Sequence, residues 1–416
     1  MNTLETTAIP STFNVEQIRS QFPILQQKIY GNKPLVYLDN AATTQKPQSV
    51  IDCIIEYYTG YNANIHRGVH FLSQKASKAF DEVRDKIQHR IHAESPNEIV
   101  FTRGTTDSVN LVASTYGRSF IGKGDEILIS AMEHHSNIVP WQMLCEEKRA
   151  VLKVIPMNAA GELLIDEFEK LLSSKTKIVS VVYISNSLGT INPVKHIIEK
   201  SHAVGAVVML DAAQAMAHEP IDVQELDCDF LASSAHKFYG PTGAGFLYGK
   251  IKHLEAMPPY QGGGDMISSV KFEKTTYNTV PFKFEAGTPH IEGVIAMGAA
   301  IDFLSKLDLD AVKTHEQALV AAAMKGLSEI PRIKLIGTAK NKASVVSFII
   351  EGANALDAGL LLDTMGIAVR TGQHCTEPAM DCLGIPGTIR ASFAVYNTMD
   401  DVKSLLEGVS KVVRML

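Results

Sequence analysis

The chain has 416 residues, of which 45% are hydrophobic and 20% are charged, as in an ordinary globular enzyme. This length predicts two domains, or one large domain with a smaller companion. The 45 acidic and 39 basic residues give a net charge of −6, which argues against a nucleic-acid-binding surface because such a surface needs an excess of basic residues.

From residue 98 onward, short apolar runs alternate with helical stretches. The runs rich in Val and Ile lie at 98–102, 125–130, 150–156, 177–185 and 206–214, and "FLASSAH" and "AGFLYG" follow them. Helical stretches lie at 105–120, 165–172 and 193–203. Apolar runs that do not alternate and are separated by helices indicate a parallel sheet covered on both faces. The chain is therefore predicted to have a doubly wound α/β fold.

Polar residues follow the predicted strands of this sheet. They are Thr102–Thr106, Ser130–His135, Ser185–Asn186, Asp211–Gln214 and Ser233–Lys237. In sheets of this kind, ligands bind just beyond the carboxyl ends of the strands. We therefore expect a ligand site at this edge.

The pattern changes after residue 255. Alternating stretches and a glycine run predict a β-hairpin excursion at about 256–290, and a long helix is expected from Glu292 to about Lys306. Strands within 343–350, 367–372 and 388–395 then alternate with helices within 355–366 and 398–413. This order indicates a smaller α+β unit at the C-terminal end.

Lys237 follows a predicted buried strand in "LASSAHKFYG". A core rarely tolerates an unpaired ammonium, and burial lowers the pKa of a lysine so that its amine can form a Schiff base with an aldehyde. Pyridoxal phosphate supplies such an aldehyde. Its ring nitrogen needs an anion, for which Asp211 is well placed, and Gln214 can donate to the phenolic oxygen.

The phosphate of this cofactor needs main-chain N–H groups at a helix N-terminus together with hydroxyls. Thr105 and Thr106 lie at such a start, and Ser234 and His236 flank the lysine and add donors. His134 is a candidate to stack on the ring. A single Asp or Thr at such a junction is most often a helix N-cap, but the joint occurrence of these residues at successive strand ends favours the cofactor.

Cys375 lies in the polar loop "VRTGQHC", where Arg370 and His374 would favour the reactive thiolate. A loop cysteine without a role is the alternative. The five cysteines are odd in number and contain no CxxC pair, so neither a disulfide framework nor a thiolate metal site is expected. Arg390, on a predicted strand of small and apolar residues, is interpreted as a carboxylate clamp for an amino-acid substrate, or else as half of a structural salt bridge.

With these residues identified, the sequence closely resembles the pyridoxal-phosphate-dependent cysteine desulfurases of the class V aminotransferase family, and among them the SufS type, which is related to selenocysteine lyase. The matching stretches are "YLDNAATTQKP", "NIHRGVHFLS", "FTRGTTDSVNLVA", "EHHSNIVPWQ", "SNSLGTINPV", "DAAQAMAH", "SSAHKFYGPTGAGFLYG", "FEAGTPHIEGVIA" and "RTGQHC". The short cysteine loop separates this type from the longer-looped NifS/IscS type, and the hairpin at 256–290 also fits the SufS type. Gln373 and Thr376 depart from the His and Ala that relatives often carry.

The resemblance implies the fold type I of pyridoxal-phosphate-dependent transferases. A mainly parallel seven-stranded sheet would lie in a large domain at 27–301, and a small α+β domain at 1–26 and 302–416 would carry the Cys375 loop and Arg390. Position by position, it implies that Lys237 binds the cofactor covalently, Asp211 pairs with the ring nitrogen, Gln214 binds the phenolic oxygen and His134 stacks on the ring. Thr105, Thr106, Ser234 and His236 would bind the phosphate, and Thr288 would reach the phosphate of a neighbouring subunit in a homodimer. Asn186 and Arg390 would bind the substrate carboxylate, Arg370 and His66 would line the site, and Cys375 would accept the sulfur.

The activity implied is the removal of sulfur from L-cysteine, which gives L-alanine and a Cys375 persulfide. An acceptor protein of the SufE or SufU type would take this sulfur for iron–sulfur cluster assembly. Selenocysteine lyase is the nearest alternative. A second alternative is an aminotransferase or kynureninase-like enzyme, and a third is a non-enzymatic binding protein. The first ten residues lack the pattern of a secretory signal and no apolar stretch is long enough to span a bilayer, so we expect a cytoplasmic protein.

Overall fold

The computed structural model describes residues 13–416. Its large sheet has seven strands in the order β4-β10-β9-β8-β7-β5-β6. The bounds are Ile99–Thr102 for β4, Glu126–Ser130 for β5, Val151–Ile155 for β6, Thr176–Val182 for β7, Val207–Asp211 for β8, Phe230–Ser234 for β9 and Gly245–Gly249 for β10. Strands β5 to β9 pair in parallel, and β10 is antiparallel to both of its neighbours. The predicted mainly parallel seven-stranded sheet is thus confirmed.

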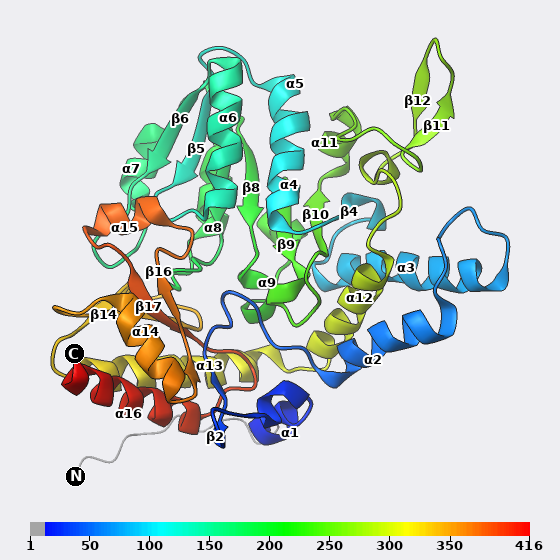
Figure 1. Cartoon of the computed structure of the whole chain (residues 1–416). Helices are drawn as coiled ribbons and strands as arrows, with labels where there is room; N and C mark the ends of the chain where they lie inside the picture. The colour runs from blue at the N-terminus through cyan, green and yellow to red at the C-terminus, as the bar shows by residue number, and fades with distance from the viewer. Residues whose placement is uncertain (1–12) are drawn as a thin grey trace.

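Successive residues of the central strands feed two separate cores. In β8, Val207 and Met209 pack into the core with helices α4 (Thr105–Val112) and α6 (Val139–Lys148). Val208 and Leu210 pack into the core on the opposite face, with helices α3 (Phe71–Arg90), α8 (Val194–Ala203) and α12 (Ile291–Ser305). Because both faces are covered (Figure 1), the strands are apolar without alternation.

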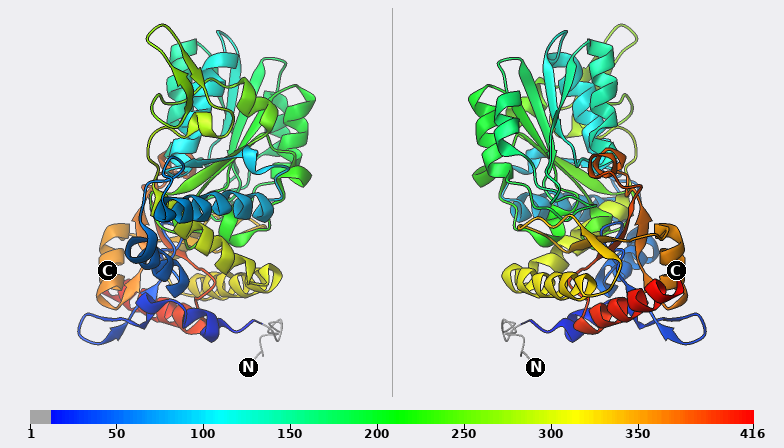
Figure 2. Two further views of the ribbon diagram at one scale, coloured as in Figure 1. Left: turned by 90° about the vertical axis from the view of Figure 1, so that its right-hand side faces the viewer. Right: turned by 90° about the vertical axis from the view of Figure 1, so that its left-hand side faces the viewer.

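A second sheet belongs to the C-terminal part of the chain. Its four antiparallel strands have the order β13-β14-β17-β16 and the bounds Ile333–Ile336, Val345–Ile350, Thr388–Ser392 and Arg370–Gly372. Three helices pack around it, namely α13 (Leu309–Ser328), α14 (Ala355–Thr364) and α16 (Met399–Met415). Figure 2 shows these elements gathered below the large sheet in both views. The predicted α+β unit is present, and α13 and α3 are long helices that the sequence interpretation did not include.

The N-terminal segment connects the two sheets. Strand β3 (Val36–Tyr37) pairs in parallel with β15 (Ile367–Ala368), and Asp39 forms a bridge with Ser392 of β17. A few residues later, the main-chain N–H of Thr44 donates to the carbonyl of His236 at 3.0 Å. The predicted domain boundaries at residues 27 and 301 stay a prediction, and residues 1–12 of the predicted small domain lie outside the described residues.

The predicted hairpin is formed by β11 (Ile267–Val270) and β12 (Thr275–Tyr277), which project from the body of the molecule (Figure 1). Other predicted elements shift by a few residues. The strands expected at 177–185 and 206–214 end at Val182 and Asp211, so Asn186 and Gln214 lie in the loops that follow. Among residues 13–416, no helix is long and apolar enough to cross a membrane.

Candidate active site

A cavity of about 300 Å³ lies where the strand ends of the large sheet face the C-terminal unit. Eleven of the predicted site residues line it: Thr105, Thr106, His134, Asn186, Asp211, Ser234, His236, Lys237, Arg370, Cys375 and Arg390. They come from the ends of five strands of the large sheet, or from the segments that directly follow them, and from two strands and one loop of the C-terminal unit. A cavity is therefore present at the edge where the ligand site is expected.

Lys237 and Asp211 face this cavity from neighbouring strands. Lys237 ends the short 3-10 turn Ala235–Lys237 directly after β9, and Asp211 is the last residue of β8. Burial lowers the pKa of Lys237, and Asp211 partly opposes that shift. Burial likewise raises the pKa of Asp211, which Lys237 partly opposes. Within residues 13–416, Lys237 Nζ has no hydrogen-bond partner, and its lowered pKa makes the neutral, nucleophilic amine more accessible.

The start of α4 forms a cradle of donors. Thr105 N donates to Ser234 Oγ at 2.8 Å, and the hydroxyls of the two residues are 2.9 Å apart. Gly104 precedes the helix with φ of 141°, and a Cβ at this position would meet Ser234 Oγ at 2.9 Å. A glycine is therefore needed for this approach. Thr106 lies in the first turn, where unpaired N–H groups favour an anion such as a phosphate.

These observations test whether the residues fit pyridoxal phosphate. The Asp211 carboxyl is 3% exposed and one oxygen accepts from Ala213 N at 2.9 Å, whereas the other has no hydrogen-bond partner among the described residues. A protonated ring nitrogen would supply that partner. Together with the amine of Lys237 and the donor cradle at Thr105, this arrangement fits the cofactor.

Burial favours the neutral form of His134. Its Nδ1 accepts a hydrogen bond from Ser136 N at 3.1 Å, so the ring proton of the neutral imidazole lies on Nε2. Burial, with Lys237 as the next contributor, lowers the pKa of His134 to about 4. A neutral ring suits contact with an aromatic cofactor, and its Nε2–H is available as a donor.

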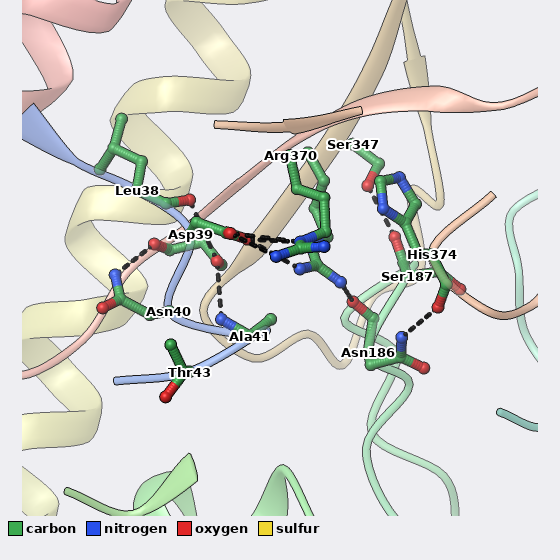
Figure 3. A network of polar contacts seen from close by, with 12 residues as sticks. Leu38, Asp39, Asn40, Ala41, Thr43, Asn186, Ser187, Ser347, Arg370 and His374 are labelled. Atoms are coloured by element: carbon green, nitrogen blue, oxygen red, sulfur yellow. Dashed lines mark hydrogen bonds and ion pairs between the residues drawn. The ribbon is translucent and has the colours of Figure 1, made fainter. Parts of the chain in front are cut away.

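Asp39 bridges the two arginines of the cavity (Figure 3). Arg370 Nε and Nη2 donate to the two carboxylate oxygens at 3.0 and 2.9 Å, and Arg390 Nη2 donates to Oδ1 at 3.1 Å. Burial lowers the pKa of Arg390 to about 10, while Asp39 holds the pKa of Arg370 above its usual value. The sequence analysis missed Asp39, although it lies in the quoted stretch "YLDNAATTQKP".

The loop that carries Asn186 is held by the small unit. Four successive carbonyls, those of residues 186–189, each accept a hydrogen bond from a donor of the C-terminal part. In order, the donors are Arg390 Nη1 at 2.9 Å, Ser347 Oγ at 2.6 Å, Lys342 Nζ, and Ala343 N at 2.8 Å. The Asn186 side chain donates to the carbonyl of His374 at 2.9 Å (Figure 3). Asn186 Oδ1 is buried and without a partner in the described chain, and the second N–H of Asn186 Nδ2 remains as a donor for a ligand carboxylate.

The Cys375 loop is short and attached on two sides. The carbonyl of Cys375 accepts a hydrogen bond from His135 N at 2.8 Å, and Glu377 N donates to His135 Nε2 at 3.2 Å. His374 and Cys375 both have φ of 56°, the left-handed conformation that side chains rarely adopt. Cys375 is exposed and also lines the cavity. The thiol is therefore open both to the cavity and to the surface.

One expectation for this loop is wrong. The sequence predicts that His374 favours the thiolate, which requires a protonated ring, but His374 is 7% exposed and burial lowers its pKa to about 3. The ring is thus neutral and its Nε2 is 2.8 Å from Thr388 Oγ1. Of the two expected cations, Arg370 remains the positively charged one.

Three predicted residues do not line this cavity. Gln214 is 4% exposed and donates to the carbonyl of Ala41 at 2.8 Å, so it supports the cavity wall from behind. Thr288 lies in a separate cavity with Arg103 and Tyr260. His66 lies in a third cavity with Asp265, and its Nε2 is 3.3 Å from Asp81 Oδ1. In the single chain, His66 therefore does not line the site as expected.

Known proteins resemble this chain over nearly its whole length. The sequence model of the family described as Aminotransferase class-V matches residues 36–405. A cysteine desulfurase of Dickeya dadantii is 47% identical over 97% of this chain and 98% of that protein. The crystal structure of the cysteine desulfurase CsdA from Escherichia coli superposes with a TM-score of 0.91 at 38% identity, covering 97% of this chain and 99% of that one. The apo structure of a cysteine desulfurase from Thermococcus onnurineus gives a TM-score of 0.92 at 36% identity, covering 99% and 100%.

Proposed function

The chain belongs to the class V aminotransferase family and is a pyridoxal-phosphate-dependent cysteine desulfurase, and we propose that Cys375 accepts the sulfur of its substrate, L-cysteine. The observation that carries this proposal is that Cys375 and Lys237 line one cavity of about 300 Å³. Cys375 reaches it from the small unit and Lys237 from the large sheet.

When bound, pyridoxal phosphate supplies an aldehyde that condenses with amines and a ring that accepts electrons from the substrate's α-carbon. Lys237 would hold it covalently and Asp211 would keep its ring nitrogen protonated. Thr105, Thr106, Ser234 and His236 would bind the phosphate. His134 would lie against the ring. Gln214 would act indirectly, by holding the main chain of Ala41 in the cavity wall. These roles are proposals supported by the cavity lining and by the carboxyl oxygen of Asp211 that has no partner among the described residues.

The chain's own residues then act in a fixed order. Arg390, Arg370 and Asn186 orient the substrate through its carboxylate. Lys237, whose pKa burial lowers, takes the α-proton as a neutral amine. The Cys375 thiolate attacks the substrate sulfur, so that an S–S bond forms and the Cβ–S bond breaks. The electron pair of that bond stays with the substrate carbon, which takes a proton and becomes a methyl group. Lys237 then returns a proton to the α-carbon, which completes alanine.

We propose that the protein is of the SufS type and delivers its sulfur to a separate acceptor protein of the SufE or SufU type, for iron–sulfur cluster assembly. Only four residues separate β16 from α15 (Glu377–Leu383), and the loop is hydrogen-bonded to His135 and Asn186. A loop that is short and anchored in this way cannot move far. The acceptor protein would therefore have to bind at the surface next to the exposed Cys375 thiol.

We also propose a homodimer in the cytoplasm. Exposed apolar side chains occur at the start of α3 and on the hairpin, where Val69 is 91% exposed, Phe71 is 75% exposed and Phe272 is fully exposed. A second copy of the chain would cover them, and Thr288 lies in a cavity apart from this chain's Lys237, which suits a role in a neighbouring subunit. All five cysteines are free, which suits a reducing compartment.

The test is the Cys375→Ala variant, assayed for alanine and sulfide release from L-cysteine with an acceptor protein present. We expect a protein that binds the cofactor and absorbs like the wild type but retains on the order of 1% of the turnover or less, because the group that receives sulfur is gone. Cys382→Ala, the exposed cysteine seven positions further on, is the matched control and should keep its turnover. Full turnover by Cys375→Ala would favour another class V enzyme, and turnover of L-selenocysteine alone would favour a selenocysteine lyase.

A further inference from the structure

Two arginines of the cavity lie directly opposite each other on neighbouring strands. Arg370 of β16 and Arg390 of β17 are register partners in the antiparallel pair. Like charges in this position repel, and Arg390 is only 1% exposed, so water does not screen it. A buried cation needs an anion to offset its desolvation. This geometry therefore depends on an anion placed between the two side chains.

Asp39 provides that anion. Its carboxylate accepts from Arg370 at 3.0 and 2.9 Å in a two-pronged contact, and from Arg390 at 3.1 Å. Charge-assisted pairs of this geometry are strong and directional. The Asp39 side chain is 16% exposed, which limits screening of the contact. Arg370, with a side chain 48% exposed, has room to turn towards solvent if this contact is lost.

The main chain holds Asp39 independently of the arginines. Its carbonyl accepts from Ala42 N at 3.1 Å and from Thr43 N at 3.3 Å. On its N-terminal side, the carbonyl of Leu38 accepts from Ser392 N at 2.7 Å. The main chain at Asp39 is thus held without the arginines, and from this anchor the carboxylate reaches both of them.

We propose that Asp39 is a positioning residue that holds Arg370 and Arg390 in the geometry that binds the substrate carboxylate, and so sets the preference for an amino acid over an amine. This inference rests on the proposed function. Two guanidinium groups and one carboxylate leave one net positive charge in the cavity wall, which a substrate carboxylate neutralises. Arg370 donates to Asp39 through Nε and Nη2, and its Nη1 has no partner within residues 13–416, so a donor remains for the substrate.

The experiment compares Asp39→Asn with the wild-type holoenzyme, using L-cysteine and cysteamine, which has the same thiol and amine but no carboxylate. We expect the KM for L-cysteine to rise about tenfold while kcat changes less than about twofold, because binding common to ground and transition states is lost. The affinity for cysteamine, read from the cofactor absorbance, should not change. An unchanged or lowered KM would mean that Asp39 only screens the arginines and would overturn the proposal.

Asp401→Asn is the control, since Asp401 is a buried aspartate that pairs with Arg19 at 3.1 Å outside the cavity. It should lower the thermal midpoint and leave the KM for L-cysteine unchanged. Asp39→Glu keeps the charge but moves it by one methylene, so it should fold even if Asp39→Asn does not, and its KM should rise about threefold, with cysteamine binding again unchanged. A wild-type KM in Asp39→Glu would count against positioning.

A second readout needs neither cofactor nor substrate. Phenylglyoxal labels accessible arginines, and mass mapping of the apo-protein gives the rate at Arg370. We expect labelling in Asp39→Asn to be at least about fivefold faster than in the wild type, because the side chain is no longer held. Equal rates would refute the positioning role. Failure of the wild type to release alanine from L-cysteine would instead refute the proposed function and leave this labelling result valid.

Discussion

Ser347→Ala tests whether the small unit holds the loop of Asn186. Ser347 is 1% exposed and its Oγ donates to the carbonyl of Ser187 at 2.6 Å. Ser187 is fully buried, and its carbonyl has no other hydrogen-bond donor in the described chain. Removing the hydroxyl leaves this carbonyl unpaired, which costs about 1–3 kcal/mol. We therefore expect the free energy of unfolding to fall by that amount.

Urea denaturation followed by tryptophan fluorescence measures the effect. The single tryptophan of the chain is Trp141, which is fully buried beside the seven-stranded sheet. Its emission therefore reports unfolding without a label. The matched control is Ser201→Ala, because Ser201 is also buried and donates at 2.6 Å, to the carbonyl of Ile197. That carbonyl lies within α8 and keeps its helical N–H partner, so the control should lose less than about 1 kcal/mol.

The enzyme should respond as well as the fold. The carbonyl next to Ser187 is that of Asn186, which accepts from Arg390, so a loosened loop disturbs the carboxylate contact. We expect the KM for L-cysteine to rise about threefold in Ser347→Ala and to stay unchanged in Ser201→Ala. Equal losses of stability in the two variants, with no change in KM, would refute the idea that the small unit holds this loop.

Two further predictions concern groups of the cavity. Borohydride reduction of the holoenzyme followed by peptide mass mapping should find the cofactor attached to the peptide that contains Lys237, and a Lys237→Ala variant should yield no such adduct; attachment at another lysine would contradict the assignment. The second concerns stability in acid. Burial lowers the pKa of folded His374 to about 3, whereas the usual value is 6.5. Between these pH values the unfolded chain binds a proton that the folded chain does not, so the free energy of unfolding decreases as the pH falls. His374→Gln should therefore lower the thermal midpoint at about pH 7 but lose less on acidification to about pH 5, and parallel curves for variant and wild type would contradict this account.

The large sheet and its ligand edge were predictable from local patterns. Runs such as "KIVSVVYIS" contain too few polar residues to face solvent on either side, so they indicate strands buried on both faces. In β8, successive residues do enter opposite cores. The carboxyl ends of parallel strands lie at the same edge of a sheet, so the polar residues at these ends lie close together. The sequence could therefore place Lys237, Asp211, Thr105 and His134 at one site.

The contacts between the two units were not predictable in this way. The placement of Arg370 opposite Arg390 depends on strand register, and a shift of one residue would turn a side chain to the other face. Asp39 joins them only because β3 pairs with β15, more than 300 residues away in the chain. The protonation of His374 was likewise misjudged, since its burial depends on how the loop folds back against Thr388.

The sequence by itself determined the parallel sheet, its polar edge and the residue types that meet there, because hydrophobic periodicity and strand-end chemistry act over short stretches of chain. Only the tertiary structure decided which of those residues share a cavity, which cations have a fixed anion and which histidines are neutral. Those properties depend on burial and on distances between segments far apart in the chain, and a linear pattern contains neither.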